Sequence, residues 1–174
     1  MKRKIGVIGS AAGIFKNDLI FKARDIGAEI AKYNCILISG ATTGLSYEAV
    51  KGAKWAGGFT VGFSPAENQT EHVENYKLPL EGFDLIVYTG FGYKGRNVVS
   101  IRSCDAVIGI SGRRGTLNEY TDALDENKTV GVLTGTGGIS DMINKIEAKV
   151  SKKGGKIFYD SDPKVLVKKV VENL

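Results

Sequence analysis

The sequence predicts an α/β fold: a single doubly wound, Rossmann-like domain with a mainly parallel sheet of about seven strands. Short apolar segments alternate with helix-like patterns along the whole 174-residue chain. These segments are apolar throughout, which is typical of parallel strands that are covered by helices on both faces. Glycine-rich turns follow five of them. Such turns are common where a strand of a parallel sheet leads into a helix.

Each strand is predicted from a short apolar run. The runs are Ile5–Gly9, Cys35–Ser39, Phe59–Phe63, Asp84–Tyr88, Ala106–Ile110, Val130–Leu133 and Lys156–Tyr159. Helices are predicted where apolar residues recur at intervals of three and four. Three such faces are Leu19, Ala23, Ile26 and Ile30; Ile139, Ile143, Ile146 and Val150; and Val167, Val170, Val171 and Leu174. Asp162 and Pro163 supply an N-cap and a first-turn residue for the last helix, whereas the polar segment Ser64 to Gly82 is expected to be irregular.

Length and composition indicate one domain, residues 1–174, in a cytoplasmic protein. No apolar run is long enough to cross a bilayer, and the basic start lacks the pattern of a signal peptide. Cys35 and Cys104 lie at the edges of apolar runs without neighbouring ligand residues, which indicates buried thiols rather than a metal site. The net charge of +5 comes largely from lysines near the C-terminus, including Lys152 and Lys153, which are interleaved with acidic residues. Mixed charges favour a solvated helix face over a nucleic-acid footprint.

The glycine-rich turns define the candidate site. Because they follow strands of a parallel sheet, they are expected to meet at its carboxyl edge, where α/β proteins bind ligands. Two of them lead directly into helices, whose N-terminal N–H groups favour anions. We therefore expect a phosphate-bearing small ligand near Gly9, Ser10, Gly40, Thr43, Gly44, Gly112, Arg113, Arg114, Gly115 and Thr116. The chain has no Walker lysine motif and no dinucleotide fingerprint, so ATP hydrolysis and NAD-linked redox chemistry are not predicted.

Two of these turns resemble the glycine motifs of the LOG-like family. Residues 39–45 (SGATTGL) resemble the family's GGGxxGLM, and residues 111–119 (SGRRGTLNE) resemble PGGxGTxxE. Arg96 precedes the second motif at the interval where the family has its arginine. The resemblance covers nearly the whole chain. The stretches SGATTGLSYEA and GRNVVSIRSCDAVIGISG are more similar to the molybdenum-cofactor-carrier-like branch than to the cytokinin-activating enzymes.

The resemblance implies a Rossmann-like, usually dimeric protein that binds a nucleotide or phosphate at these turns. The activating enzymes split a nucleoside 5′-monophosphate into base and ribose 5-phosphate, and their catalytic pair corresponds to Arg96 and Glu119. A carboxylate can stabilise the positive charge that develops on the sugar, and a guanidinium can assist the leaving base. The carrier branch implies the alternative: a protein without turnover and without a resident cofactor, which holds a nucleotide or the molybdenum cofactor as cargo. A DNA-processing family shares the fold, but the scattered lysines argue against single-strand DNA binding.

Structural roles are alternatives for several of these residues. Thr116 and Glu119 fit a capping box at a helix start, and Thr42 and Thr43 could cap another helix. Arg96 could be an exposed helix residue.

Histidine and aromatic residues are expected to have structural roles. His72, the single histidine, is expected at the surface of the polar segment. Tyr88 and Tyr93 are expected to pack rather than to stack on a base, and Trp55 is expected in the core or at a dimer interface. The apolar residues that favour a homodimer are Phe91, Tyr93 and Val98.

Arginine replaces glycine in the second motif. Arg113 stands where the family has its second glycine; if that position requires a positive φ, Arg113 must be strained or the turn reshaped. Arg113 and Arg114 would either crowd a phosphate or clamp it, and we favour a clamp. Ser46 and Tyr47, after Leu45, also indicate an altered pocket. A hydrolytic site retained for binding is therefore an open alternative.

Overall fold

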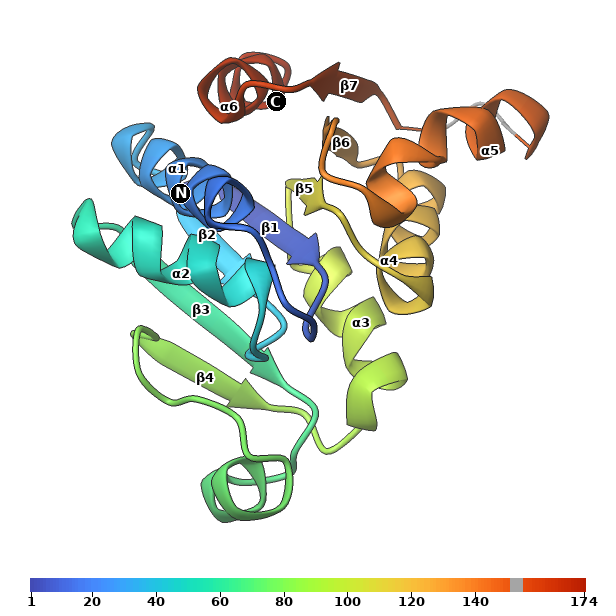
Figure 1. The fold of residues 1–174 in the computed structure, drawn as a ribbon. Helices are drawn as coiled ribbons and strands as arrows, with labels where there is room; N and C mark the ends of the chain where they lie inside the picture. Colours follow the sequence, from blue (N-terminus) through green and yellow to red (C-terminus); the bar gives the residue numbers. More distant parts are fainter. Residues whose placement is uncertain (151–154) are drawn as a thin grey trace.

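The computed structural model describes residues 1–150 and 155–174. Its centre is a sheet of seven parallel strands in the order β4-β3-β2-β1-β5-β6-β7 (Figure 1). The doubly wound α/β fold expected from the sequence is confirmed. Lys152 and Lys153, which were expected on a helix face, lie outside the described residues.

The strands lie where the apolar runs predict them. They are β1 (Lys4–Gly9), β2 (Ile36–Ser39), β3 (Phe59–Ser64), β4 (Leu85–Tyr88), β5 (Ala106–Ile110), β6 (Thr129–Leu133) and β7 (Ile157–Asp160). Every residue of β5 and β6 is buried, because these strands pair on both edges and are covered on both faces. This burial explains why their sequences are apolar throughout rather than alternating.

Helices cover both faces of the sheet (Figure 1). In the described residues they are α1 (Asn17–Lys32), α2 (Leu45–Trp55), α3 (Gly92–Arg102), α4 (Arg114–Asp125), α5 (Ile143–Val150) and α6 (Pro163–Val171). The core on one face joins α1, α2 and α6 to the sheet, with Ile26 and Leu166 fully buried. The core on the other face joins α3, α4 and α5 to the sheet, with Tyr120 and Ile143 fully buried. Two separate cores on one sheet are typical of a doubly wound domain.

The strand order reverses between β1 and β5. The chain passes from β1 toward β2 on one side and from β5 toward β6 on the other. The two strands nevertheless end side by side, because Gly9 pairs with Ile110. Their following loops diverge, and open parallel sheets bind ligands in the crevice that this divergence creates.

The expected helix faces are partly confirmed. The carboxylate of Asp162 caps α6, accepting hydrogen bonds from the N–H groups of Lys164 and Val165 at 2.7 and 3.1 Å. Ile139 does not share a helix with Ile143, because it lies in a separate 3₁₀ helix, η2 (Gly138–Asp141). The segment from residue 64 to residue 82 is not wholly irregular, since it contains a π-helical turn, η1 (Glu71–Asn75). Helix α6 ends before Leu174.

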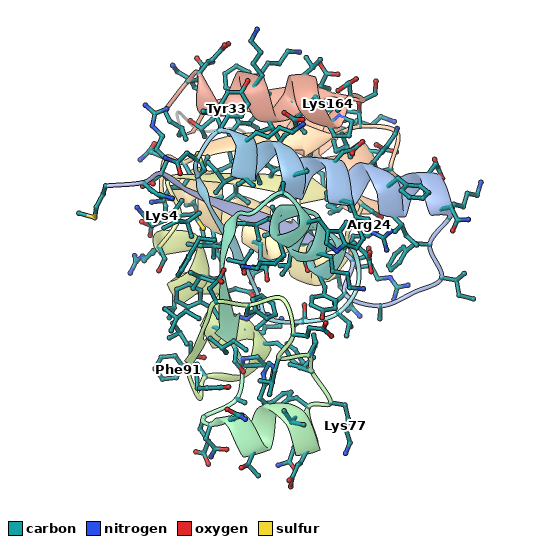
Figure 2. The ribbon with its side chains drawn as sticks, turned by 90° about the vertical axis from the view of Figure 1, so that its left-hand side faces the viewer. Lys4, Arg24, Tyr33, Lys77, Phe91 and Lys164 are labelled. Atoms are coloured by element: carbon teal, nitrogen blue, oxygen red, sulfur yellow. The ribbon has the colours of Figure 1, made fainter. Side chains whose placement is uncertain are left out.

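The expected surface position of His72 is wrong, and so is the core alternative for Trp55. His72 is fully buried rather than exposed, because both of its ring nitrogens form hydrogen bonds inside the protein. Trp55 is 69% exposed and so does not belong to the core. The guanidinium carbon of Arg24 lies 4.7 Å from the centre of the Trp55 ring, and Figure 2 shows Arg24 on the surface of α1.

Cys35 and Cys104 are free and buried, as expected. Burial raises the pKa of the Cys104 thiol to about 12, so this side chain is a neutral part of the core. No helix in the part of the chain described here is both long enough and apolar enough to cross a membrane.

Candidate functional site

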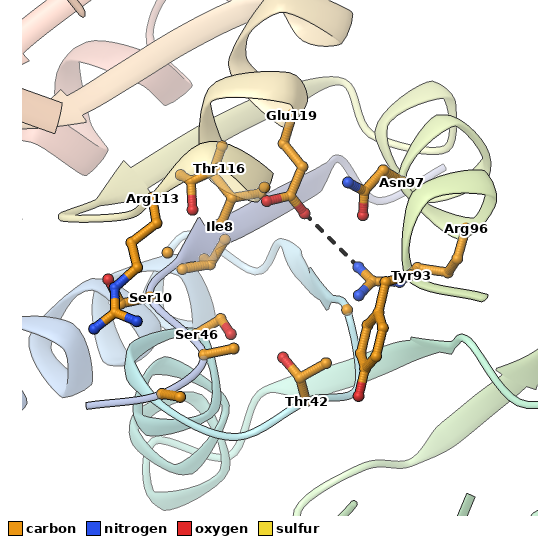
Figure 3. Close-up of a pocket in the computed structure, with 16 residues that line it drawn as sticks. Ile8, Ser10, Thr42, Ser46, Tyr93, Arg96, Asn97, Arg113, Thr116 and Glu119 are labelled. Atoms are coloured by element: carbon orange, nitrogen blue, oxygen red, sulfur yellow. Dashed lines mark ion pairs between the residues drawn. The ribbon is translucent and has the colours of Figure 1, made fainter. Parts of the chain in front are cut away.

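A cavity of about 300 Å³ opens at the switch point (Figure 3). Its volume is at the lower end of the range of roughly 300–1,000 Å³ that is usual for small-molecule sites. The walls come from the loops after β1 and β2, the starts of α2 and α4, and the first two turns of α3. These segments are distant in the sequence and meet only because of the strand order.

Ser10, after β1, fixes the turn after β5. Its side-chain oxygen accepts a hydrogen bond from the N–H of Gly112 at 3.0 Å and lies 3.4 Å from the hydroxyl of Ser111. Ser111 and Gly112 have φ angles of 55° and 100°, whereas Arg113 is extended with a φ of −126°. The expected strain at Arg113 is therefore absent, and the left-handed conformation falls on Ser111 instead.

The glycine-rich turn after β6 supports this structure and does not offer an anion site. The carboxylate of Asp141 accepts hydrogen bonds from the N–H groups of Gly135 and Gly137, both at 2.7 Å. The protein's own carboxylate thus occupies the amides that a phosphate would need. The neighbouring Thr136 hydroxyl oxygen accepts a hydrogen bond from the N–H of Ser111 at 2.9 Å.

Thr43 and Gly44 join the loops after β1 and β2. The Thr43 hydroxyl donates a hydrogen bond to the Ala11 carbonyl oxygen at 2.7 Å, and the Leu45 N–H donates to the Ser10 carbonyl oxygen at 2.9 Å. Gly44 is the N-cap of α2 and has a φ of 80°, and no side chain caps this helix. The interpretation of the threonines as capping residues is therefore wrong.

The first turn of α4 faces the cavity. The N–H groups of Arg114, Gly115 and Thr116 have no acceptor within residues 1–150 and 155–174. Gly115 and Thr116 line the cavity, and a Cβ added at Gly115 would meet no protein atom within 4 Å. Arg113 also lines the cavity, whereas the exposed side chain of Arg114 does not. This open helix N-terminus favours an anion.

Arg96 enters the cavity from α3 and is buried. Its side chain is not an exposed helix residue, since Arg96 is only 5% exposed. Its Nε atom has no hydrogen-bond partner in the described part of the chain. Burial lowers the pKa of Arg96, but a guanidinium stays charged in proteins. Gly40 leaves room for this group, because a Cβ at Gly40 would overlap Nη1 of Arg96.

The carboxyl group of Glu119, on α4, points toward the guanidinium of Arg96, on α3, where both side chains line the cavity (Figure 3). Its Oε1 lies 3.7 Å from Nη1 of Arg96, which is an ion pair without a short hydrogen bond. Burial raises the pKa of Glu119 to about 7, although the nearby guanidinium acts in the opposite direction. The capping-box interpretation is wrong, because α4 begins before Thr116 and has no side-chain cap. Glu119 is therefore a carboxyl group that exchanges a proton near neutral pH.

The structure brings most of the sequence-predicted site residues together. Those that line the cavity are Gly9, Ser10, Gly40, Arg96, Arg113, Gly115, Thr116 and Glu119. Those that lie outside its walls are Thr43, Gly44, Gly112 and Arg114. Sequence reasoning missed Tyr93 and Asn97 as wall residues. Tyr93 precedes Arg96 by three residues and Asn97 by four on the same helix, and this spacing provided a signal because residues three or four apart share a helix face.

The fold and the cavity define a Rossmann-like protein with a candidate small-molecule site at the strand-order switch point. The SLOG cluster4 family model matches residues 2–167, and the chain belongs to this family. An uncharacterized protein of Archaeoglobus fulgidus is 34% identical over 130 residues, which are 75% of this chain and 79% of that protein. The X-ray structure of the structural genomics target TM1055 has a TM-score of 0.85 at 25% identity and covers 99% of both chains.

The molybdenum cofactor binding protein of Rippkaea orientalis has a TM-score of 0.78 at 26% identity, covering 99% of this chain and 98% of that one. The chain is thus a LOG-like protein near the molybdenum cofactor carrier branch. DNA processing protein A of Helicobacter pylori has a TM-score of 0.69, covering 98% of this chain and 81% of that one. At 15% identity, this likeness shows the fold alone.

Proposed function

We propose that this protein binds a small molecule that carries a phosphate ester, either a nucleoside monophosphate or the molybdenum cofactor, in the cavity at the switch point. The observation that carries this proposal is the buried guanidinium of Arg96, which faces the cavity with its Nε unpaired in the described residues. A buried charge is costly unless hydrogen bonds satisfy it. A ligand with oxygen acceptors would supply them.

The phosphate would bind at the start of α4. The free N–H groups of Gly115 and Thr116 and the guanidinium of Arg113 border this end of the cavity. Amides at a helix N-terminus and a cation on the same wall suit a doubly charged phosphate better than a neutral group. The open space above Gly115 leaves the backbone accessible to phosphate oxygens.

Calorimetric titration with AMP tests the phosphate end. Arg113→Ala removes a cation from the wall and should weaken binding by about tenfold or more, the equivalent of a hydrogen bond to a charged group. Arg114→Ala is the matched control, since that side chain is exposed and lies off the cavity. An equal loss of AMP affinity in the two variants, or no binding of any monophosphate tested, would contradict the proposal. Mass spectrometry of small molecules released from freshly purified, denatured protein identifies the natural ligand.

Hydrolysis of a nucleoside 5′-monophosphate is a second candidate function, favoured by the pKa of Glu119 near 7 beside Arg96. Water would attack C1′ as the C1′–N bond breaks, and the bonding pair would leave with the base. Glu119 would accept the proton from water, and Arg96 would stabilise the negative charge on the departing base until it is protonated. The products are the free base and ribose 5-phosphate.

Release of free base from AMP or another purine monophosphate would demonstrate this activity. Glu119→Gln keeps the shape of the side chain but removes the proton acceptor, and should abolish release while AMP still binds. If no free base is released from any monophosphate, the protein binds its ligand without turning it over. That result would favour cargo binding, the role that the likeness to the cofactor-binding protein suggests. A pterin recovered from the purified protein would support that role directly.

We also propose a homodimer. Phe91, at the N-cap of α3, and Val98, on α3, are 66% and 42% exposed, and together they leave apolar surface that a second copy of the chain would cover. Sedimentation velocity at micromolar concentration should give the mass of two chains. A single monomeric species would contradict it.

A further inference from the structure

The connection between β3 and β4 reaches the candidate site. Figure 1 shows its π-helical turn, η1, below β4 at the edge of the sheet, and Figure 2 shows Lys77 and Phe91 in the same lower part of the molecule. Backbone hydrogen bonds tie the loop before α3 to this connection: the Gly90 N–H donates to Ala66 and the Gly92 N–H to Pro65, at 2.9 and 3.0 Å. The start of α3 is thus held by the connection.

His72 anchors η1. Its Nε2–H donates to the carbonyl oxygen of Pro79 at 3.1 Å, because that oxygen can only accept. Its Nδ1 therefore accepts a hydrogen bond from the Ser64 hydroxyl at 2.8 Å. Together these bonds join the end of β3, η1 and the chain that returns to β4. Tyr76 follows η1 directly, and its N–H donates to the Glu71 carbonyl oxygen at 3.0 Å.

Tyr76 in turn supports Tyr93. The two rings meet edge to face, with centroids 5.4 Å apart and planes at 81°. Tyr93 lines the cavity yet remains 49% exposed, so its ring is held from one side and open on another. In Figure 3 its ring lies beside Arg96 and near Thr42, at the opposite end of the cavity from Arg113. A braced aromatic ring with an uncovered surface is the usual platform for a planar heterocycle.

We propose that Tyr93, braced by Tyr76, is the residue that recognises the ring end of the ligand, and that the natural ligand is a phosphate ester with a planar heterocycle. This inference rests on the proposed function. The phosphate lies at the start of α4, and the heterocycle stacks on Tyr93 at the far end. Arg96 and Glu119 then lie between the two ends, beside the linking group.

Guanosine 5′-monophosphate and ribose 5-phosphate separate the two ends of the ligand. Guanine shares the 2-amino-4-oxopyrimidine ring of pterins, and ribose 5-phosphate lacks a heterocycle. Tyr93→Leu keeps an apolar side chain but removes the ring, and should weaken binding of the nucleotide roughly 5- to 150-fold, the range for loss of one base–aromatic stack. Affinity for ribose 5-phosphate should change less than about twofold. Tyr93→Phe should keep nucleotide affinity, and Tyr76→Leu should lower it partially.

The guanine H8 resonance gives a direct signal of stacking. It should shift upfield when the nucleotide binds the natural protein and the Tyr93→Phe variant, and lose that shift with Tyr93→Leu. Unchanged nucleotide affinity in Tyr93→Leu, or an equal loss for both probes, would overturn the stacking role. Binding of ribose 5-phosphate without binding of the nucleotide would also overturn it, while leaving the phosphate site intact. Failure of the natural protein to bind either probe would overturn the proposed function itself.

Discussion

Replacing Glu119 with Gln should change how stability depends on pH. The side chain of Glu119 is only 12% exposed beside Arg96, and this desolvation raises its pKa from 4.5 to about 7. In the unfolded chain the same carboxyl group returns to its ordinary pKa. Gln has nearly the same shape and stays neutral, so a comparison of the two proteins isolates the cost of ionising this one carboxyl group.

The sign follows from proton binding. Between pH 4.5 and 7 the folded protein holds a proton on Glu119 that the unfolded chain has released, so folding becomes less favourable as the pH rises. A shift of this size corresponds to about 3 kcal/mol, since each pKa unit is worth about 1.4 kcal/mol. Part of this loss in the free energy of unfolding has already occurred at pH 5. The free energy of unfolding of the natural protein should therefore fall by about 2–3 kcal/mol relative to Glu119→Gln between pH 5 and pH 8.

Urea denaturation of both proteins at pH 5 and pH 8 measures this difference. The comparison uses the change with pH rather than either absolute stability, so any constant cost of placing an amide beside Arg96 cancels. A carbon-13 titration of the Glu119 carboxyl group gives its pKa directly. Parallel stability profiles, or a Glu119 pKa near 4.5, would refute the argument that burial outweighs the attraction of Arg96.

Three further substitutions test the frame around the cavity. Gly40→Ala introduces a Cβ where the Arg96 guanidinium lies, so AMP affinity should fall at least tenfold and stability should fall by about 1–3 kcal/mol. Unchanged affinity in calorimetry would count against that packing. Ser10→Ala leaves the buried N–H of Gly112 without its acceptor and should cost about 1–3 kcal/mol in urea denaturation. His72→Leu breaks two buried hydrogen bonds and should also cost about 1–3 kcal/mol; an unchanged midpoint would show that His72 does not anchor η1.

Much of the fold could be predicted from local patterns. The run Ala106–Ile110 coincides with β5 because a strand buried on both faces has no polar position. The boundary near Ile139 was missed, since Ile139 and Ile143 keep the four-residue spacing of a helix face although η2 ends at Asp141 and α5 begins at Ile143. The burial of His72 could not be foreseen, because it depends on acceptor and donor groups that only the folded β3–β4 connection brings to the ring.

The candidate site could be predicted less completely. The glycine turns indicated the right edge of the sheet, and Gly115 and Thr116 do line a cavity there. Whether the amides of a turn are free is a separate question, decided by other side chains. Those after β6 are occupied by Asp141, while those at the start of α4 are open.

The sequence by itself determined where the strands, helices and glycine turns lie. The spacing of apolar residues and the conformational freedom of glycine both act on the local backbone. Tertiary structure alone decided the character of Arg96 and Glu119. Removal from water raises the pKa of Glu119 and leaves Nε of Arg96 without a partner in the described residues, and that removal requires walls from α3, α4 and the loops after β1 and β2. Desolvation is a property of the assembled surroundings, so the pKa of Glu119 is set by the folded protein rather than by the identity of the residue.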